Sequence, residues 1–155
     1  MSIKQRITKD LTSALKAGNK ERLSTLRMVK SRIQEAEVSL RSEKGVDYEL
    51  DDDEATQVLS TYAKQRRDSI ESYREAGRED LAAKEESELA LVQDYLPRQL
   101  STDEVQKVVK EAIEQVGATS SRDMGAVMKA VMPKVRGVAD GKLVNKTVRE
   151  MLAAD

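Results

Sequence analysis

Cysteine and histidine are both absent from this 155-residue sequence. Without cysteine the chain forms no disulfide and offers a metal no thiolate, and without histidine it lacks the commonest acid/base group and metal ligand at neutral pH. The sequence also contains no amidase nucleophile arrangement and no glycine-rich phosphate loop. We therefore predict no catalytic residue, no metal site and no cofactor, and favour a protein without catalytic activity of its own.

Aromatic and turn-forming residues are scarce as well. Phe and Trp are absent, aromatic residues make up 3% of the chain, and there are only 7 Gly and 2 Pro. An all-β domain needs a turn signal about every 8 to 12 residues, which this sequence does not supply. Its cores must be built from Leu, Val, Ile, Met and Ala, which suit helix bundles. These absences predict an all-α protein.

Long apolar runs are missing too. A helix that spans a bilayer needs roughly 20 predominantly apolar residues, and no stretch of the sequence approaches that length. Residues 1–4 lead directly into an amphipathic pattern instead of the apolar centre of a signal peptide. The sequence thus predicts no membrane segment and a cytoplasmic location.

Charge is nearly balanced in total, at −1, but is uneven along the chain. Residues 1–44 carry 11 Lys/Arg against 5 Asp/Glu, residues 47–121 carry 9 against 19, and residues 122–149 carry 7 against 2. Two basic ends therefore flank an acidic middle. The basic ends suit a surface for phosphate groups, and neutralisation of the acidic middle is the alternative.

Four helices are predicted in the first 96 residues, from apolar residues at spacings of three and four. Ser2 can cap the first helix and Gly18 can close it. The acidic run at 51–54 suits a helix N-terminus, because carboxylates interact favourably with the free amides there. A metal cluster is the weaker alternative, since adjacent helical residues point about 100° apart and no calcium-loop pattern follows. The later helices are expected at about 20–42, 51–76 and 79–95.

A domain boundary is predicted at residues 97–100. Pro97 stops the preceding helix, and the sequence Ser-Thr-Asp-Glu at 101–104 has the form of a capping box that starts a new one. We expect a four-helix N-terminal domain at residues 1–96 and a small three-helix C-terminal domain at residues 97–155.

The stretch from Met124 to Val144 is the most informative part of the chain. It begins with a stripe of methionine and valine at offsets of 0, 3, 4, 7, 8 and 11, which places them on one face of a helix. Core packing is the favoured role of the methionines, and an adaptable groove for a partner helix is the alternative. The stripe consists of Met124, Val127, Met128, Val131, Met132 and Val135.

A turn should follow this stripe. Pro133 cannot donate to the carbonyl four residues back, so the helix is expected to end or kink near Met132. Gly137 and Gly141 are expected to adopt left-handed conformations, which glycine tolerates without steric cost. Asp140 can then cap the last helix.

Basic side chains cluster around this turn, opposed nearby only by Asp140. They suit contact with the phosphates of an RNA backbone, and an ordinary solvated surface is the alternative. We predict that the RNA-binding residues are Lys129, Lys134, Arg136, Lys142 and Lys146. A second basic stripe lies on the predicted helix at 20–42, where an ordinary surface role or pairing with the acidic middle is favoured over phosphate binding. Its members are Lys20, Arg27, Lys30 and Arg41.

Three patches of this sequence resemble the YqeY-like family. The first comprises Gly125, Met128, Pro133, Gly137, Ala-Asp-Gly at 139–141 and Val-Asn at 144–145. The second is Asp-Tyr-Leu-Pro-Arg-Gln-Leu-Ser at 94–101, and the third is Lys-Glu-Arg-Leu-Ser-Thr-Leu-Arg at 20–27. The sequence departs from the family at Ala126 and Val138, where lysine and arginine are usual.

The resemblance has functional implications, because the family shares a module with the tail of the B subunit of glutamine-dependent aminoacyl-tRNA amidotransferases. It implies a helical module associated with tRNA and with carbon–nitrogen ligase chemistry that uses glutamine as amide donor. The candidate partners are thus tRNA and an amidotransferase or other protein; no oligomeric state is predicted. A protein-interaction scaffold with no nucleic-acid role is the alternative, and a hydrolase that uses buried carboxylates is a third and weaker one.

Overall fold

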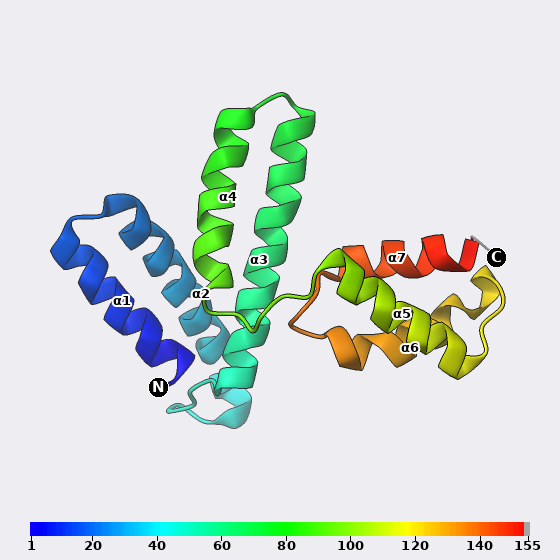
Figure 1. Ribbon diagram of the computed structural model, residues 1–155. Helices are drawn as coiled ribbons and strands as arrows, with labels where there is room; N and C mark the ends of the chain where they lie inside the picture. The colour runs from blue at the N-terminus through cyan, green and yellow to red at the C-terminus, as the bar shows by residue number, and fades with distance from the viewer. Residues whose placement is uncertain (154–155) are drawn as a thin grey trace. The chain divides into compact units, whose positions relative to one another are not determined.

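The computed structural model describes residues 1–153, which fold into α-helices with one short 3-10 helix and no strand (Figure 1). This confirms the predicted all-α class. The elements are α1 (Ile3–Ala17), α2 (Lys20–Lys44), α3 (Asp52–Glu75), α4 (Glu79–Gln93), α5 (Thr102–Val116), η1 (Ser121–Asp123), α6 (Met124–Val135) and α7 (Gly141–Ala153).

Contacts within the chain group these helices into two compact units, Met1–Leu96 and Pro97–Asp155. The first contains α1 to α4, and the second contains α5, η1, α6 and α7. Whether each unit is an independently folding domain stays a prediction.

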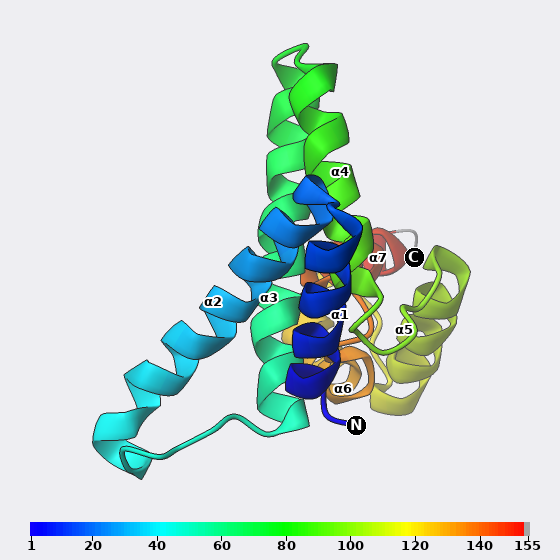
Figure 2. The ribbon, with the colours of Figure 1, turned by 90° about the vertical axis from the view of Figure 1, so that its left-hand side faces the viewer.

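The N-terminal unit consists of two helical hairpins. Helix α1 lies beside α2, and α3 lies beside α4 (Figures 1 and 2). Their apolar faces meet in one core, which is built from aliphatic residues and two tyrosines. Its buried members are Ile3, Ile7, Ala14, Leu26, Val29, Ile33, Leu50, Ala55, Leu59, Tyr62, Ala63, Val92 and Tyr95.

Helix ends in this unit follow the capping residues that the sequence indicates. Ser2 and Gln5 form a capping box on α1, and Gly18 closes that helix with φ of 67°. Asp51 caps α3 by accepting from the amide of Glu54 at 2.9 Å, and the Glu54 carboxylate accepts in return from the Asp51 amide. The acidic run is therefore a helix N-terminus, as predicted.

A buried carboxylate, Glu37 on α2, ties three segments of this unit together. It is only 5% exposed, and it forms an ion pair with Lys4 on α1. The same oxygen, Oε1, accepts from the backbone amide of Leu50 at 3.1 Å in the loop before α3. Burial lowers the pKa of Lys4, but hydrogen bonds and attraction to Glu37 and then to Glu49 outweigh that effect and raise it. The apolar patterning that predicted α2 gave no indication of this contact.

The C-terminal unit packs α5, α6 and α7 around a core that is mostly valine. The buried members are Val105, Val109, Ala112, Val127, Val131, Val135, Val144, Val148 and Leu152. The methionines of the predicted stripe, Met124, Met128 and Met132, are partly buried and pack against this core. Core packing, the favoured role of the methionines, therefore fits their position.

Helix α5 begins with half of the predicted capping box. Ser101 accepts from the amide of Glu104 at 3.2 Å, as expected. The Glu104 carboxylate instead pairs with Arg98, at 2.9 and 2.8 Å. Its bonds from Arg98 hold the pKa of Glu104 down to about 2. Arg98, which precedes the box, therefore takes the place of the Ser101 amide as the partner of the Glu104 carboxylate.

Pro133 lies inside α6, which does not end near Met132 but continues to Val135. The proline is exposed, on the side of the helix away from the buried valines. The carbonyl that loses its donor is that of exposed Lys129, where water can take the place of the missing amide. Burial of Val131 and Val135 then favours continuation of the helix.

Candidate functional site

The predicted RNA-binding residues lie on α6, on the turn that follows it, and on α7. All five side chains, Lys129, Lys134, Arg136, Lys142 and Lys146, are exposed. We call these five residues the basic ridge. It belongs entirely to the C-terminal unit.

The α6 half of the ridge faces solvent because the valines occupy the other side of the helix. Lys129 follows buried Val127 by two residues, or about 200° around the helix axis. Within residues 1–153, Lys129, Lys134 and Arg136 have no carboxylate oxygen within 4.0 Å of their side-chain nitrogens. These three cations are available to an external anion.

The α7 half is partly engaged with its own helix. Lys146 lies 3.9 Å from a carboxylate oxygen of Glu150, an exposed pair of the kind that contributes little to stability. Arg149, next to the ridge, donates to the side-chain oxygen of Asn145 at 2.8 Å. Because both contacts are exposed, Lys146 and Arg149 can exchange these partners for a phosphate at small cost in free energy.

The turn between α6 and α7 is defined by glycine and aspartate. Gly137 has φ of 77°, the left-handed conformation that was predicted. The amides of Val138 and Ala139 both donate to the carbonyl of Val135 at 3.0 Å, which closes the end of α6. Asp140 accepts from the amide of Lys142 at 3.2 Å and so caps α7, also as predicted.

Gly141 does not share this conformation. It is the first residue of α7, and its φ is not positive. The left-handed prediction is therefore wrong at this position, because Asp140 already supplies the cap and the chain enters the helix directly. A Cβ added to Gly141 would meet nothing within 4 Å.

Two residues that the sequence did not assign to the site, Gln99 and Leu100, hold the turn in place. Gln99 donates from its side-chain amide to the carbonyl of Gly137 at 3.0 Å, and the Leu100 amide donates to the carbonyl of Val138 at 2.7 Å. These bonds span almost 40 residues, so helical periodicity could not predict them. They fix the segment before α5 to the loop that carries Arg136.

We expect Gly137→Val to destabilise the C-terminal unit by about 1 kcal/mol or more, because a β-branched side chain is strained at positive φ. Gly141→Ala is the matched control and should change the unfolding free energy by less than about 0.5 kcal/mol. Thermal and urea unfolding followed by circular dichroism would measure both. Equal effects of the two substitutions would contradict the role assigned to Gly137.

The second basic stripe named from the sequence lies in the N-terminal unit, as do the buried tyrosines. Lys20, Arg27, Lys30 and Arg41 are exposed on α2. Tyr62 and Tyr95 are buried in the N-terminal core, and Tyr48 packs against it. Within residues 1–153, no group of three metal-binding side chains comes together. No helix in the same range is long and apolar enough to cross a membrane.

Comparison with protein families covers nearly the whole chain. A family model described as Yqey-like protein matches residues 4–152. The chain belongs to the YqeY-like family. This confirms the resemblance seen in the sequence patches on α2, at the end of the N-terminal unit and around the basic ridge.

Two relatives of this chain share one name. The chain is 30% identical over 153 residues to altered inheritance of mitochondria protein 41, mitochondrial, of Pyrenophora tritici-repentis, covering 96% of this chain and 80% of that protein. It is 32% identical over 125 residues to the protein of the same name from Vanderwaltozyma polyspora, covering 76% of this chain and 64% of that protein.

A shorter match concerns an amidotransferase. The chain is 42% identical over 57 residues to the E subunit of the glutamyl-tRNA(Gln) amidotransferase of Thermococcus sibiricus. The match covers 34% of this chain and 9% of that protein. This similarity is thus to one small part of a much larger protein.

Proposed function

We propose that this YqeY-like protein is a non-catalytic module that associates with tRNA and contacts its backbone phosphates through the basic ridge. The observation that carries the proposal is the group of three exposed cations, Lys129, Lys134 and Arg136, without carboxylate partners in residues 1–153. Ammonium and guanidinium groups at an open surface bind phosphate oxygens by charge-assisted hydrogen bonds.

The neighbouring turn supports this role by limiting movement of the loop. Gly137 and Asp140 shape it, and Gln99 bonds to it from a distant part of the sequence. A rigid loop loses little conformational freedom when it binds, so more of the electrostatic attraction is retained as affinity. The partial similarity to an amidotransferase that is named for a tRNA substrate is consistent with this partner.

The proposal includes association with the machinery that amidates aminoacyl-tRNA, with glutamine as amide donor. In that case the chain supplies RNA contacts and the partner supplies catalysis. A cytoplasmic location stays a prediction from the sequence, whereas the two fungal relatives are named as mitochondrial proteins.

Salt dependence tests the RNA contact directly. Binding of fluorescently labelled tRNA should be measurable at low salt by anisotropy, and log K should fall linearly with log salt, with a slope of at most about 4.5 if all five cations contact phosphates. The proposal would be contradicted if the protein bound no tRNA at low salt, both by itself and when mixed with a purified amidotransferase. Pull-downs from lysate with and without ribonuclease would then test the scaffold alternative.

A further inference from the structure

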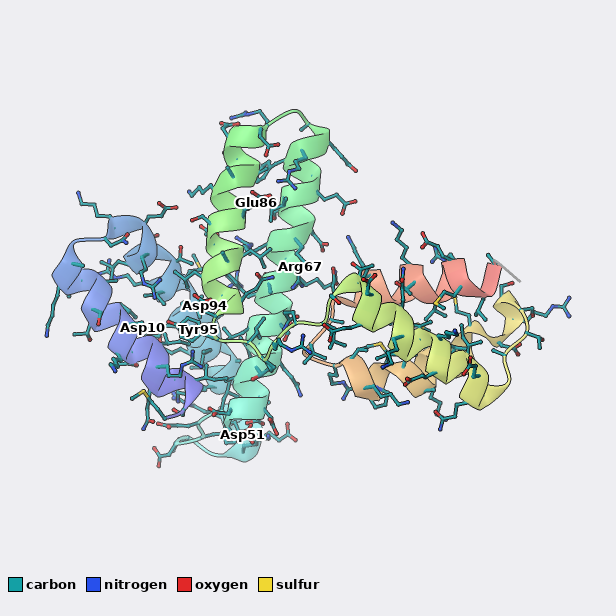
Figure 3. All side chains as sticks on the ribbon, viewed as in Figure 1. Asp10, Asp51, Arg67, Glu86, Asp94 and Tyr95 are labelled. Carbon is teal, nitrogen blue, oxygen red and sulfur yellow. The ribbon has the colours of Figure 1, made fainter. Side chains whose placement is uncertain are left out.

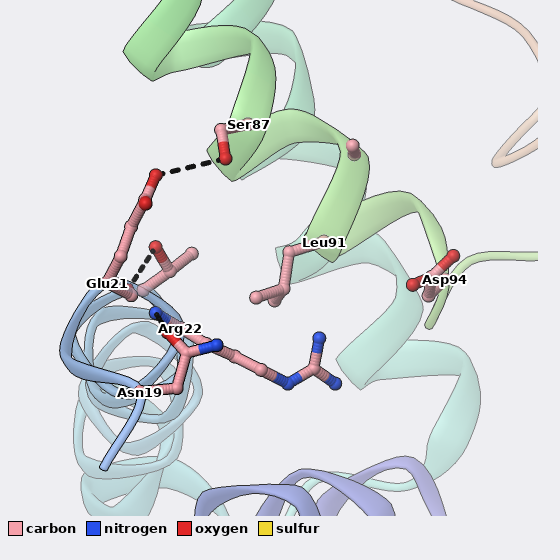
Figure 4. A pocket seen from close by; sticks show the side chains of 8 residues that line it. Asn19, Glu21, Arg22, Ser87, Leu91 and Asp94 are labelled. Carbon is pink, nitrogen blue, oxygen red and sulfur yellow. Dashed lines mark hydrogen bonds between the residues drawn. The ribbon is translucent and has the colours of Figure 1, made fainter. Parts of the chain in front are cut away.

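A cleft in the N-terminal unit lies between the first turns of α2 and the last turns of α4 (Figure 4). Its volume is about 370 Å³, within the range of about 300 to 1,000 Å³ that small-molecule sites occupy. Each helix, together with its capping residue, contributes four lining residues. They are Asn19, Glu21, Arg22 and Thr25 from the α2 side, with Ser87, Ala90, Leu91 and Asp94 from the α4 side.

Arg22 is the central charged group of this cleft. Its side chain extends across the opening below Leu91, and its guanidinium has no hydrogen bond and no carboxylate within 4.0 Å in residues 1–153. Its backbone amide donates to the side-chain oxygen of Asn19 at 3.1 Å. Arg22 is nevertheless half-buried. A guanidinium with five unused donors, on a half-buried residue that lines a cleft, is suited to a planar carboxylate.

Carboxylates stand at the two ends of the cleft. Glu21 accepts from the Ser87 hydroxyl at 3.1 Å through Oε1, which leaves its second oxygen without a hydrogen bond in residues 1–153. The Asp94 carboxylate, at the other end, likewise has no side-chain partner in that range. Both can accept hydrogen bonds from an ammonium group.

Other charged groups beside the cleft are already engaged with one another. Tyr95, which lies beside Asp10 (Figure 3), donates to it. The Arg6 guanidinium lies 5.1 Å from the centre of the Tyr95 ring. Arg6 also donates to the backbone carbonyl of Asp94 at 3.0 Å. These contacts hold the end of α4 against α1, so Asp94 is positioned while its carboxylate stays open.

The arrangement of charges selects a class of ligand. A phosphate would meet two carboxylates, and a simple amine would meet Arg22, whereas a zwitterion satisfies both kinds of group. We propose that this cleft binds a free α-amino acid, its carboxylate on Arg22 and its ammonium group on the Asp94 carboxylate. Leu91 and Ala90 form an apolar wall, which favours an uncharged side chain on the ligand.

The test is amide NMR of the full chain, titrated separately with each of the twenty common L-amino acids at millimolar concentration. At least one should saturably shift the amides of 19–25 and 87–94. The N-acetyl and carboxamide derivatives of that amino acid, which each lack one charge, should bind at least about tenfold more weakly. Inorganic phosphate should shift none of these amides.

Variants separate the two ends of the proposed ligand. Arg22→Gln should abolish amino-acid binding, and Arg27→Gln, on the exposed face of the same helix, should leave it unchanged. Asp94→Asn, at an exposed position, should weaken binding of the amino acid but not binding of its N-acetyl derivative. The proposal is overturned if no amino acid binds, if Arg22→Gln binds as well as the wild type, or if phosphate or the N-acetyl derivative binds equally well.

Discussion

Replacement of Lys129, Lys134 and Arg136 together by glutamate should reduce tRNA affinity by well over tenfold at low salt. Each cation that contacts a phosphate contributes about 0.9 to the slope of log K against log salt on duplex nucleic acid, so the loss of three should lower the slope by close to three. The reversed charges add repulsion. Anisotropy titrations over a series of salt concentrations would measure both quantities.

The matched control reverses three cations elsewhere in the same unit. Lys107, Lys110 and Arg122 are exposed on α5 and η1, and their replacement by glutamate changes the net charge by the same amount. This variant should keep most of the wild-type affinity and nearly the same slope. An equal loss in both variants would mean that tRNA responds only to net charge, and the basic ridge would not be a site. Circular dichroism should show unchanged helicity in each.

Glu37→Ala should cost about 2 to 4 kcal/mol of stability, because it leaves the Leu50 amide without its acceptor and Lys4 without its buried partner. Glu37→Gln should cost less, since its amide oxygen can still accept from Leu50. Urea unfolding followed by circular dichroism would give these free energies.

Glu43→Ala provides the comparison for this second experiment. Glu43 is exposed near the end of the same helix, so its removal should change stability by less than about 0.5 kcal/mol. If Glu37→Ala were as harmless as Glu43→Ala, the buried ion pair would contribute nothing to the folded state. Apolar packing between α1 and α2 would then account for the stability of this part of the unit.

Local patterns in the sequence predicted most of the helices. The 3.6-residue spacing of valine and leucine, together with caps such as Ser2 and Asp51, depends only on neighbours in the chain. Pro133 and Gly141 show where local rules are insufficient. Helix α6 continues beyond Pro133 because its valines are buried in the core. Gly141 is helical because Asp140 caps α7 directly.

Contacts between distant residues were beyond sequence reasoning. The cations of the basic ridge were selected because they are close in sequence, and whether they bind RNA stays a prediction. The hydrogen bonds of Gln99 and Glu37, and the position of Arg22 in a cleft whose other side is α4, depend on tertiary packing. The periodicity of one helix shows which of its faces is buried but not which residues of another helix pack against that face.

The backbone bond from Leu100 to Val138 has a practical consequence for dividing the chain. A C-terminal fragment that begins at Ser101, where the helix cap makes a natural starting point, would lack both Leu100 and Gln99. Its loop at Gly137 would keep its own glycine but lose two hydrogen bonds that close it from outside. A fragment that preserves both bonds therefore starts at or before Gln99, inside the segment that joins α4 to α5.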